Sequence, residues 1–217
     1  MALGYTQPLY ILAFDHRGSF QKKMFGIEGD PTAEETERIS DAKRLIFEGM
    51  ELADWLHAND GKFLFELLVP AEDAQLESVG GDTDRYDAEL RPKLMKQAIA
   101  AAQDFGVEVD VWKIEGVDAR EDAEMLAQQS RAGEGREGVV CVLLGRGASD
   151  DKVDHWLRQA APVEGFVGFA IGRSIWCDAL KGFLDESLTR EDAASKIADN
   201  YLRFVKVYED AETSARV

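Results

Sequence analysis

Five short apolar runs alternate with amphipathic helical patterns along the chain, and this alternation restricts the fold more than any other feature. Each run is rich in Leu, β-branched or aromatic side chains, as in strands that are buried on both faces of a parallel sheet. The runs are residues 8–14 (PLYILAF), 62–69 (KFLFELLV), 109–115 (VDVWKIE), 138–145 (GVVCVLLG) and 165–172 (GFVGFAIG).

Helical periodicity fills most of the segments between these runs, with apolar residues three and four positions apart. The predicted helices cover residues 33–59, 88–105, 119–132, 149–160 and 189–210. Residues 71–87 are instead polar and predict one long connection, which in compact domains serves as a lid or binding loop or is simply solvated. The strand–helix alternation predicts a single α/β domain over residues 1–217 with parallel crossovers.

Composition narrows the class of protein. The 217 residues are 45% hydrophobic, and 42 acidic against 25 basic residues give a formal net charge of −17. An acidic chain disfavours binding to nucleic-acid phosphates and to anionic lipid. The longest uncharged stretch, residues 1–14, is too short for a membrane span and lacks the basic start of a signal peptide. Two cysteines without a CxxC motif fit the reducing cytoplasm, and three scattered histidines give no metal-site spacing.

Charged residues occur at or near the end of every predicted strand. Because ligands bind beyond the carboxyl ends of parallel strands, this convergence favours a functional site there. The candidate residues at these ends are Asp15, Arg17, Glu66, Lys113, Glu115, Gly145, Arg146, Gly147, Gly172 and Arg173.

Lys113 is the most informative of these residues, because it lies between Trp112 and Ile114 in a run that should be buried. A lysine amine held away from water deprotonates more readily, and a free amine attacks carbonyl groups to form a Schiff base. The alternative is a structural ion pair between Lys113 and either Glu115 or Glu66.

Glu66 is the only charged residue in the run FLFELLV, so it needs an ion-pair partner or carries a proton. A carboxyl group in such a place is a plausible general acid or base. Asp15 and Arg17 follow the first run, and their spacing suits a surface turn as well as a catalytic role.

Arg146 and Arg173 each follow a strand and have glycine neighbours. Glycine lets backbone N–H groups approach an anion, the next helix adds positive potential, and arginine donates forked hydrogen bonds to phosphate oxygens. Two such loops on consecutive strands predict a phosphate site. Two surface turns with incidental arginines are the alternative.

Six motifs together resemble one protein family. They are FDHRGSF at residues 14–20, FELLVP at 65–70, RPKLM at 91–95, DVWKIEG at 110–116, LGRG at 144–147 and GFAIGRS at 168–174. The chain resembles the aldolase-like domain of the DUF2090 type that follows the kinase in the bifunctional 5-dehydro-2-deoxygluconokinase/5-dehydro-2-deoxyphosphogluconate aldolases of myo-inositol catabolism. That domain is similar to the class I tagatose-1,6-bisphosphate aldolases, which are (β/α)8 TIM barrels.

The resemblance implies a role for several residues. Lys113 matches the Schiff-base lysine, and Glu66 matches the acid/base carboxylate of the preceding strand. Asp15 and Arg17 match the Asp and Arg of the first-strand motif, and Arg173 matches the arginine on the phosphate side of the site.

The chain departs from this family in length. The family has eight βα units and this sequence has five, because strands two to four are missing near residues 50–54. A lysine that the aldolases carry on strand four has no counterpart. Five strands would leave open edges, so we expect the chain to associate with a second copy or with a sugar kinase domain.

The expected activity is therefore a metal-independent and cofactor-independent carbon–carbon lyase on a shortened barrel. The resemblance implies cleavage of 2-deoxy-5-keto-D-gluconate 6-phosphate to dihydroxyacetone phosphate and malonate semialdehyde. Another ketose phosphate, such as tagatose 1,6-bisphosphate, is a second expectation. A non-catalytic module that binds a sugar phosphate or a partner protein is a third.

Overall fold

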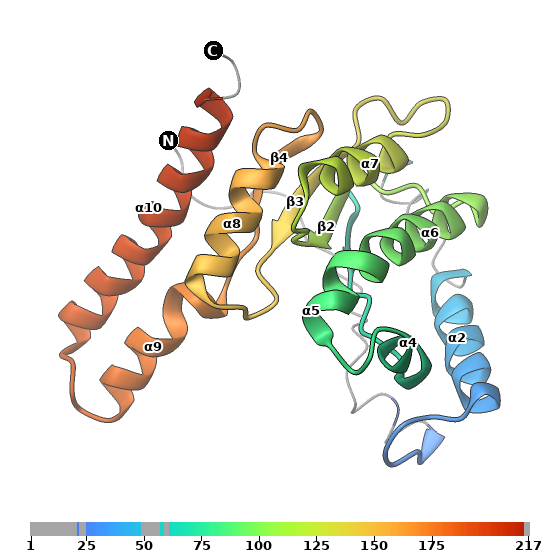
Figure 1. Ribbon diagram of the computed structural model, residues 1–217, viewed down its shortest axis with the longest axis horizontal. Helices are drawn as coiled ribbons and strands as arrows, with labels where there is room; N and C mark the ends of the chain where they lie inside the picture. Colours follow the sequence, from blue (N-terminus) through green and yellow to red (C-terminus); the bar gives the residue numbers. More distant parts are fainter. Residues whose placement is uncertain (1–20, 22–24, 49–56, 59–60, 215–217) are drawn as a thin grey trace. The chain divides into compact units, whose positions relative to one another are not determined.

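The computed structural model describes residues 21, 25–48, 57–58 and 61–214 (Figure 1), which form parts of two compact units, residues 1–55 and 56–217. In the first unit, helix α2 (Ala33–Glu48) begins with a reciprocal cap. The Thr32 backbone N–H donates to the Glu35 carboxylate, and the Glu35 N–H donates to the Thr32 hydroxyl. The predicted strand at residues 8–14 lies outside the described residues.

Four parallel strands form the sheet of the second unit, in the order β1-β2-β3-β4. Their bounds are Leu64–Leu67, Val111–Glu115, Val140–Leu144 and Phe166–Phe169. Each lies within a run that the sequence predicted to be a strand, which confirms the α/β class and the parallel sheet. Each strand is the neighbour of the one before it, so every crossover moves in the same direction along the sheet.

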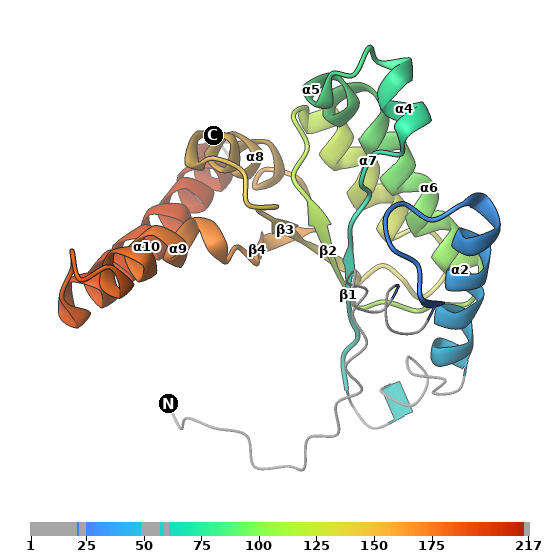
Figure 2. The same cartoon turned by 90° about the horizontal axis from the view of Figure 1, so that it is seen from below.

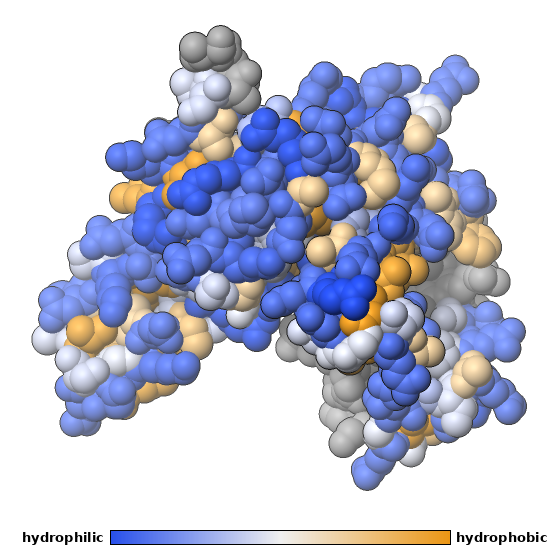
Figure 3. All heavy atoms as spheres, in the orientation of Figure 1, coloured by the Kyte–Doolittle hydropathy of each residue, from blue (hydrophilic) through white to orange (hydrophobic). Residues whose placement is uncertain are grey.

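Helices connect the strands and pack beside them. Figure 2 shows α6, α7 and α8 on one side of the strands. The helical segments are α4 (Asp73–Ser78), α5 (Thr83–Arg85), the π-helix η1 (Tyr86–Leu90), α6 (Arg91–Asp104), α7 (Arg120–Ser130), α8 (Asp150–Ala160), α9 (Arg173–Leu184) and α10 (Arg190–Ser214). The outward surface over α8 is mainly hydrophilic (Figure 3), as expected for the solvent side of an amphipathic helix.

The two faces of the sheet differ in burial. On the helix-covered face, Trp112, Cys141 and Leu143 are almost completely buried. Cys141 Sγ lies 3.3 Å from the hydroxyl of Ser130 in α7, and burial raises the pKa of this thiol to about 11. Cys141 is therefore the core residue that its place in an apolar run predicts. Residues at alternate positions point to the opposite face, here called the open face, where Val111, Lys113 and Val142 are only partly buried.

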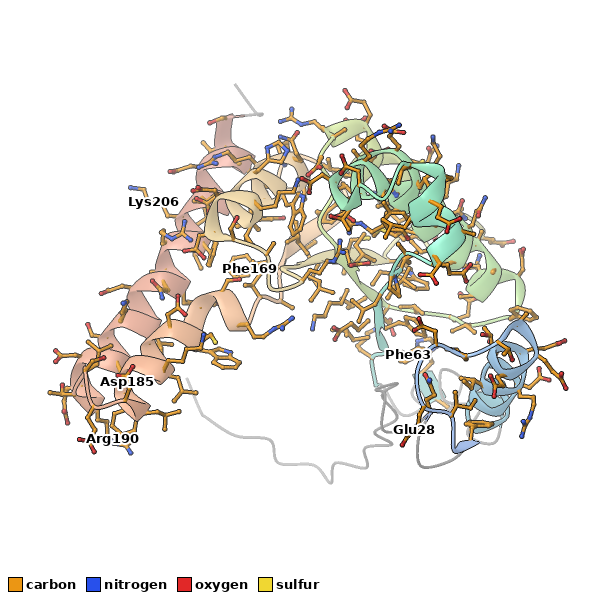
Figure 4. All side chains as sticks on the ribbon, turned by 60° about the horizontal axis from the view of Figure 1, so that its bottom comes forward. Glu28, Phe63, Phe169, Asp185, Arg190 and Lys206 are labelled. Atoms are coloured by element: carbon orange, nitrogen blue, oxygen red, sulfur yellow. The ribbon has the colours of Figure 1, made fainter. Side chains whose placement is uncertain are left out.

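The long helix α10 joins the core through aromatic contacts. The ring of Phe169, labelled in Figure 4, lies 5.9–6.4 Å from the rings of Tyr201, Phe204 and Tyr208. Asp185 directly follows α9 and Arg190 begins α10, and both are labelled in the same view. The Arg190 guanidinium stacks over Phe183 at 5.0 Å.

Two segments differ from the sequence prediction. Most of residues 71–87, predicted as one polar loop, form short helices. Their ends are capped locally, since Gln75 reaches back to the Glu72 N–H and the Asp82 carboxylate accepts from two backbone N–H groups. The helix α9 was not predicted either, because Arg173 and Ser174 were interpreted only as the loop after a strand.

Gly116, directly after β2, has no room for a side chain. A Cβ atom there would lie 2.3 Å from the indole ring of Trp156, which is buried and fixed by a hydrogen bond to Asp118. We expect Gly116→Ala to lower the free energy of unfolding by about 1–3 kcal/mol, because the core must shift to accept the methyl group. Urea unfolding measures this, with Gly138→Ala as control, since a Cβ at Gly138 meets nothing within 4 Å. Equal stability of both variants would contradict this packing.

Candidate functional site

Lys113 and Glu66 form an ion pair on the open face of the sheet. They are register partners on β2 and β1, and Lys113 Nζ lies 2.8 Å from Glu66 Oε2. Their side chains are 20% and 43% exposed. Of the two ion pairs that the sequence allowed for Lys113, this is the one that forms, because register places Glu66 beside it.

The surroundings of this pair are apolar. Neighbouring positions on the same face carry Leu64, Val111 and Val142, and Val167 of β4 is also exposed. The sequence predicted a buried Lys113, and its side chain is largely but not completely buried, with 20% exposed on the open face. The arrangement places one accessible amine against one accessible carboxylate, which is a geometry suited to proton exchange.

Glu115 lies at the carboxyl end of β2 and is almost fully buried, with 4% of its surface exposed. Its Oε1 lies 3.2 Å from Arg146 Nε and 3.6 Å from Arg91 Nη1, and its Oε2 accepts a hydrogen bond from the Val69 backbone N–H. Both carboxylate oxygens are thus engaged within the protein.

Arg91, the first residue of α6, is the most buried charge in the described part of the chain, with none of its surface exposed. Its Nε lies 3.0 Å from Asp87 Oδ1, and its Nη2 donates to the Gly116 carbonyl at 2.9 Å. Nε and Nη1 make ion-pair contacts without hydrogen-bond geometry. The guanidinium therefore depends on Asp87 and Glu115 for charge compensation.

The π-helix η1 places Asp87 between the two arginines. Asp87 accepts from Arg146 Nη1 with both oxygens, at 2.7 and 2.8 Å, while it also contacts Arg91. Burial alone would lower the pKa of Arg146, but the contacts with Asp87 and Glu115 raise it. Asp87, Arg91, Glu115 and Arg146, here called the charge cluster, balance two positive and two negative charges.

The charge cluster fixes the end of β1. Val69, two residues beyond the strand, donates its N–H to Glu115 and accepts at its carbonyl from the Tyr86 hydroxyl, at 2.8 and 3.0 Å. Since β1 carries Glu66, these two bonds hold the strand that positions Glu66 against Lys113.

The two glycine–arginine loops lie together, as the sequence predicted. Arg173 Nη2 donates to the Arg146 carbonyl at 3.3 Å, and a Cβ at Gly147 would lie 2.8 Å from the same Arg173 atom. Gly147 also has a φ of +75°, which favours glycine, so both its backbone conformation and the close approach of Arg173 disfavour a side chain there. A Cβ at Gly145 would lie 3.1 Å from Ile171 of the other loop. Gly172 is the N-cap of α9 and offers no side-chain cap.

Asp15 and Arg17 lie outside the described residues. The structure adds Tyr86, Asp87 and Arg91, which sequence reasoning assigned no role. The motif RPKLM includes Arg91, but its partners come from a segment interpreted as a polar loop and from the following strand.

A second charged group lies at the opposite end of β2. Burial would raise the pKa of Asp110, but hydrogen bonds from Lys62, from the Phe63 N–H and from His57 lower it from 3.8 to about 2. A carboxyl group with a lowered folded-state pKa stabilises the fold above its unfolded pKa, and this stabilisation is lost as the pH falls from about 4 to 2.

We expect Asp110 to contribute roughly 2 kcal/mol to the pH dependence of the free energy of unfolding between pH 5 and 2. Urea unfolding across this pH range, compared with Asp110→Asn, measures the contribution as the difference between two slopes. The other carboxyl groups are present in both proteins, so their contributions to the pH dependence cancel in the difference. Parallel curves for the two proteins would show that Asp110 is not stabilised by these bonds.

Among the described residues, no helix is long and apolar enough to cross a membrane. No curated protein matches this sequence. One family matches residues 50–212, a span that includes all four strands, the Lys113–Glu66 pair and the charge cluster, and excludes the motif with Asp15 and Arg17. The matched span exceeds half of the chain, and the chain therefore belongs to the family described as "uncharacterized protein conserved in bacteria (DUF2090)".

Proposed function

We propose that the chain is a class I aldolase-type lyase, built on part of a (β/α)8 barrel, that cleaves a sugar-acid phosphate through a Schiff base on Lys113. The observation that carries the proposal is the Lys113–Glu66 contact of 2.8 Å on the open face of the sheet. The sequential order of the four parallel strands supports the barrel class, since barrel strands follow one another in sequence order.

The proposed substrate is 2-deoxy-5-keto-D-gluconate 6-phosphate. Lys113 Nζ adds to the C5 ketone, and loss of water gives an iminium ion. A base, Glu66 or Asp15, takes the proton of the C3 hydroxyl, the C3–C4 bond breaks, and its electron pair moves toward the iminium nitrogen. C3 leaves as the aldehyde of malonate semialdehyde. Protonation at C4 and hydrolysis release dihydroxyacetone phosphate and restore the amine.

The phosphate end of the substrate fits the loops after β3 and β4. Arg173, the first residue of α9, is exposed and has its guanidinium over Gly147. The uncapped end of α9 adds positive potential for an anion. Arg146 is partly exposed in the neighbouring loop, but Asp87 and Glu115 already bind its guanidinium, so its role in this proposal is to place Arg173 through its carbonyl. Glu115, with both oxygens engaged, acts in this proposal by positioning Val69 and Arg146 and not by touching the substrate.

Direct assay tests the proposal. The wild-type chain should release dihydroxyacetone phosphate, detected by a coupled reductase, from 2-deoxy-5-keto-D-gluconate 6-phosphate faster than from tagatose 1,6-bisphosphate. Release from the second compound alone would keep the mechanism and change the substrate. No release from either, with an intact fold, would count against the lyase.

A non-catalytic sugar-phosphate or partner-binding module is the second candidate, because Lys113 is already ion-paired as a structural lysine would be. In that case Lys113→Ala would leave phosphosugar affinity unchanged.

For both candidate functions we propose that the protein acts in the cytoplasm and associates with a second copy or with a sugar kinase domain. The supporting observation is that β1 and β4 each have one neighbour in the described sheet, with Leu64 and Val167 exposed beside them.

A further inference from the structure

A cavity of about 360 Å³ lies between three helices, away from the candidate functional site. Arg120 begins α7, Arg158 lies in the last turn of α8, and the remaining wall belongs to the last two turns of α10, which packs along α8 (Figure 1). The residues from α10 are Val207, Asp210, Ala211 and Ser214.

Of the two arginines at this cavity, Arg120 has no ion-pair partner among the described residues, and Arg158 has only a long pair with a carboxylate that it shares. Arg120 makes no ion pair or hydrogen bond there. Arg158 lies 3.9 Å from Asp154, but that carboxylate is already bound by Arg203 at 2.7 and 2.8 Å. Two guanidinium groups at one cavity, one of them without an ion-pair partner among the described residues, stand out in a chain with a formal net charge of −17.

The rest of the lining defines the kind of ligand. Val207 and Ala211 give an apolar wall, and Asp210 is the one acidic residue that lines the cavity, so the lining carries a net positive charge. The acidic residues of the first turn of α7, Glu121 and Asp122, do not line it. The volume lies at the small end of the range for small-molecule sites.

We propose that this cavity binds a small organic anion through a phosphate or carboxylate group, which Arg120 and Arg158 hold from two helices. Forked guanidinium–oxyanion hydrogen bonds supply the recognition, and Val207 and Ala211 contact the apolar body of the ligand. The site is separate from the phosphate loops at Arg146 and Arg173, and it does not depend on the proposed lyase activity.

Titration with inorganic phosphate at low ionic strength tests the proposal, with backbone amide shifts of labelled protein as readout. We expect saturable shifts at Arg120, Ala211 and Ser214 with a dissociation constant of about 1 mM. The double variant Arg120→Gln/Arg158→Gln should weaken this binding about tenfold or more. Asp210→Asn should tighten it about threefold, because a like charge is removed.

Two control variants test whether the amide shifts come from phosphate bound at this cavity and not from phosphate bound elsewhere on the protein. Arg85→Gln removes one charge from an exposed pair with Glu89 elsewhere and should leave the shifts unchanged. Arg173→Gln removes the proposed substrate-phosphate residue and should also leave them unchanged, whether or not the lyase proposal holds. An absence of saturable shifts, unchanged binding in the double variant, or weaker binding in Asp210→Asn would each overturn the proposal.

Discussion

Arg91→Met should lower the free energy of unfolding by about 3–5 kcal/mol, the largest stability effect that we expect from one substitution in this chain. The substitution removes a fully buried charge and leaves Asp87 and Glu115 sharing Arg146 alone. It also leaves the Gly116 carbonyl without its donor at 2.9 Å. The cost is mainly that of buried carboxylates without compensation.

Urea unfolding at neutral pH measures this effect, and Arg85→Met is the matched control. Arg85 pairs with Glu89 at 2.9 Å, but both side chains are about half exposed, so its loss should cost far less than the loss of Arg91. Adding Asp87→Asn to Arg91→Met should recover part of the loss, because Glu115 and Arg146 then balance each other in charge. A change of less than 1 kcal/mol in Arg91→Met would show that the charge cluster does not stabilise the fold.

Lys113→Arg should abolish turnover, with a loss of at least about a thousandfold in kcat, while changing the unfolding free energy by less than about 1 kcal/mol. Arginine keeps the positive charge beside Glu66 and so preserves the ion pair on the open face. Its guanidinium stays protonated and does not form a Schiff base. The variant therefore separates the structural role of Lys113 from the chemical one.

Glu66→Gln is the companion variant. It removes the proton acceptor but leaves the amine in place, so the Schiff base should still form while cleavage slows by about 10²–10⁴-fold. Turnover in Lys113→Arg at a rate near that of the wild type would rule out covalent catalysis by this amine. Equal activity of Glu66→Gln and the wild type would leave Asp15 as the base.

The sheet could be predicted from the sequence because the four runs are mainly apolar, with Glu66, Lys113 and Glu115 as the charged residues of the strands. The helix α9 has a clear helical period, since its buried residues Ile175, Ala179 and Gly182 lie three and four positions apart. It escaped prediction because Arg173 and Ser174 were interpreted as the loop after an apolar strand. The short helices within residues 71–87 were not predicted, because single capping residues such as Asp82 specify them and they have no apolar period.

The site could be predicted only in part. The sequence shows that Lys113 and Glu66 each lie in an otherwise apolar strand. The register between the two strands decides which carboxylate pairs with the lysine. The partners of Arg91 are likewise set by tertiary packing, since Glu115 and the Gly116 carbonyl lie 24 and 25 residues away in the chain. The convergence of Arg146 and Arg173 followed from their equivalent places after consecutive strands.

Reductive trapping of the amine tests the central proposal most directly. Wild-type protein incubated with 2-deoxy-5-keto-D-gluconate 6-phosphate and borohydride should gain the mass of a reduced adduct, located by peptide mass spectrometry at Lys113. Lys113→Arg should gain none under the same conditions. Release of dihydroxyacetone phosphate without an adduct, or an adduct on another lysine, would contradict the account.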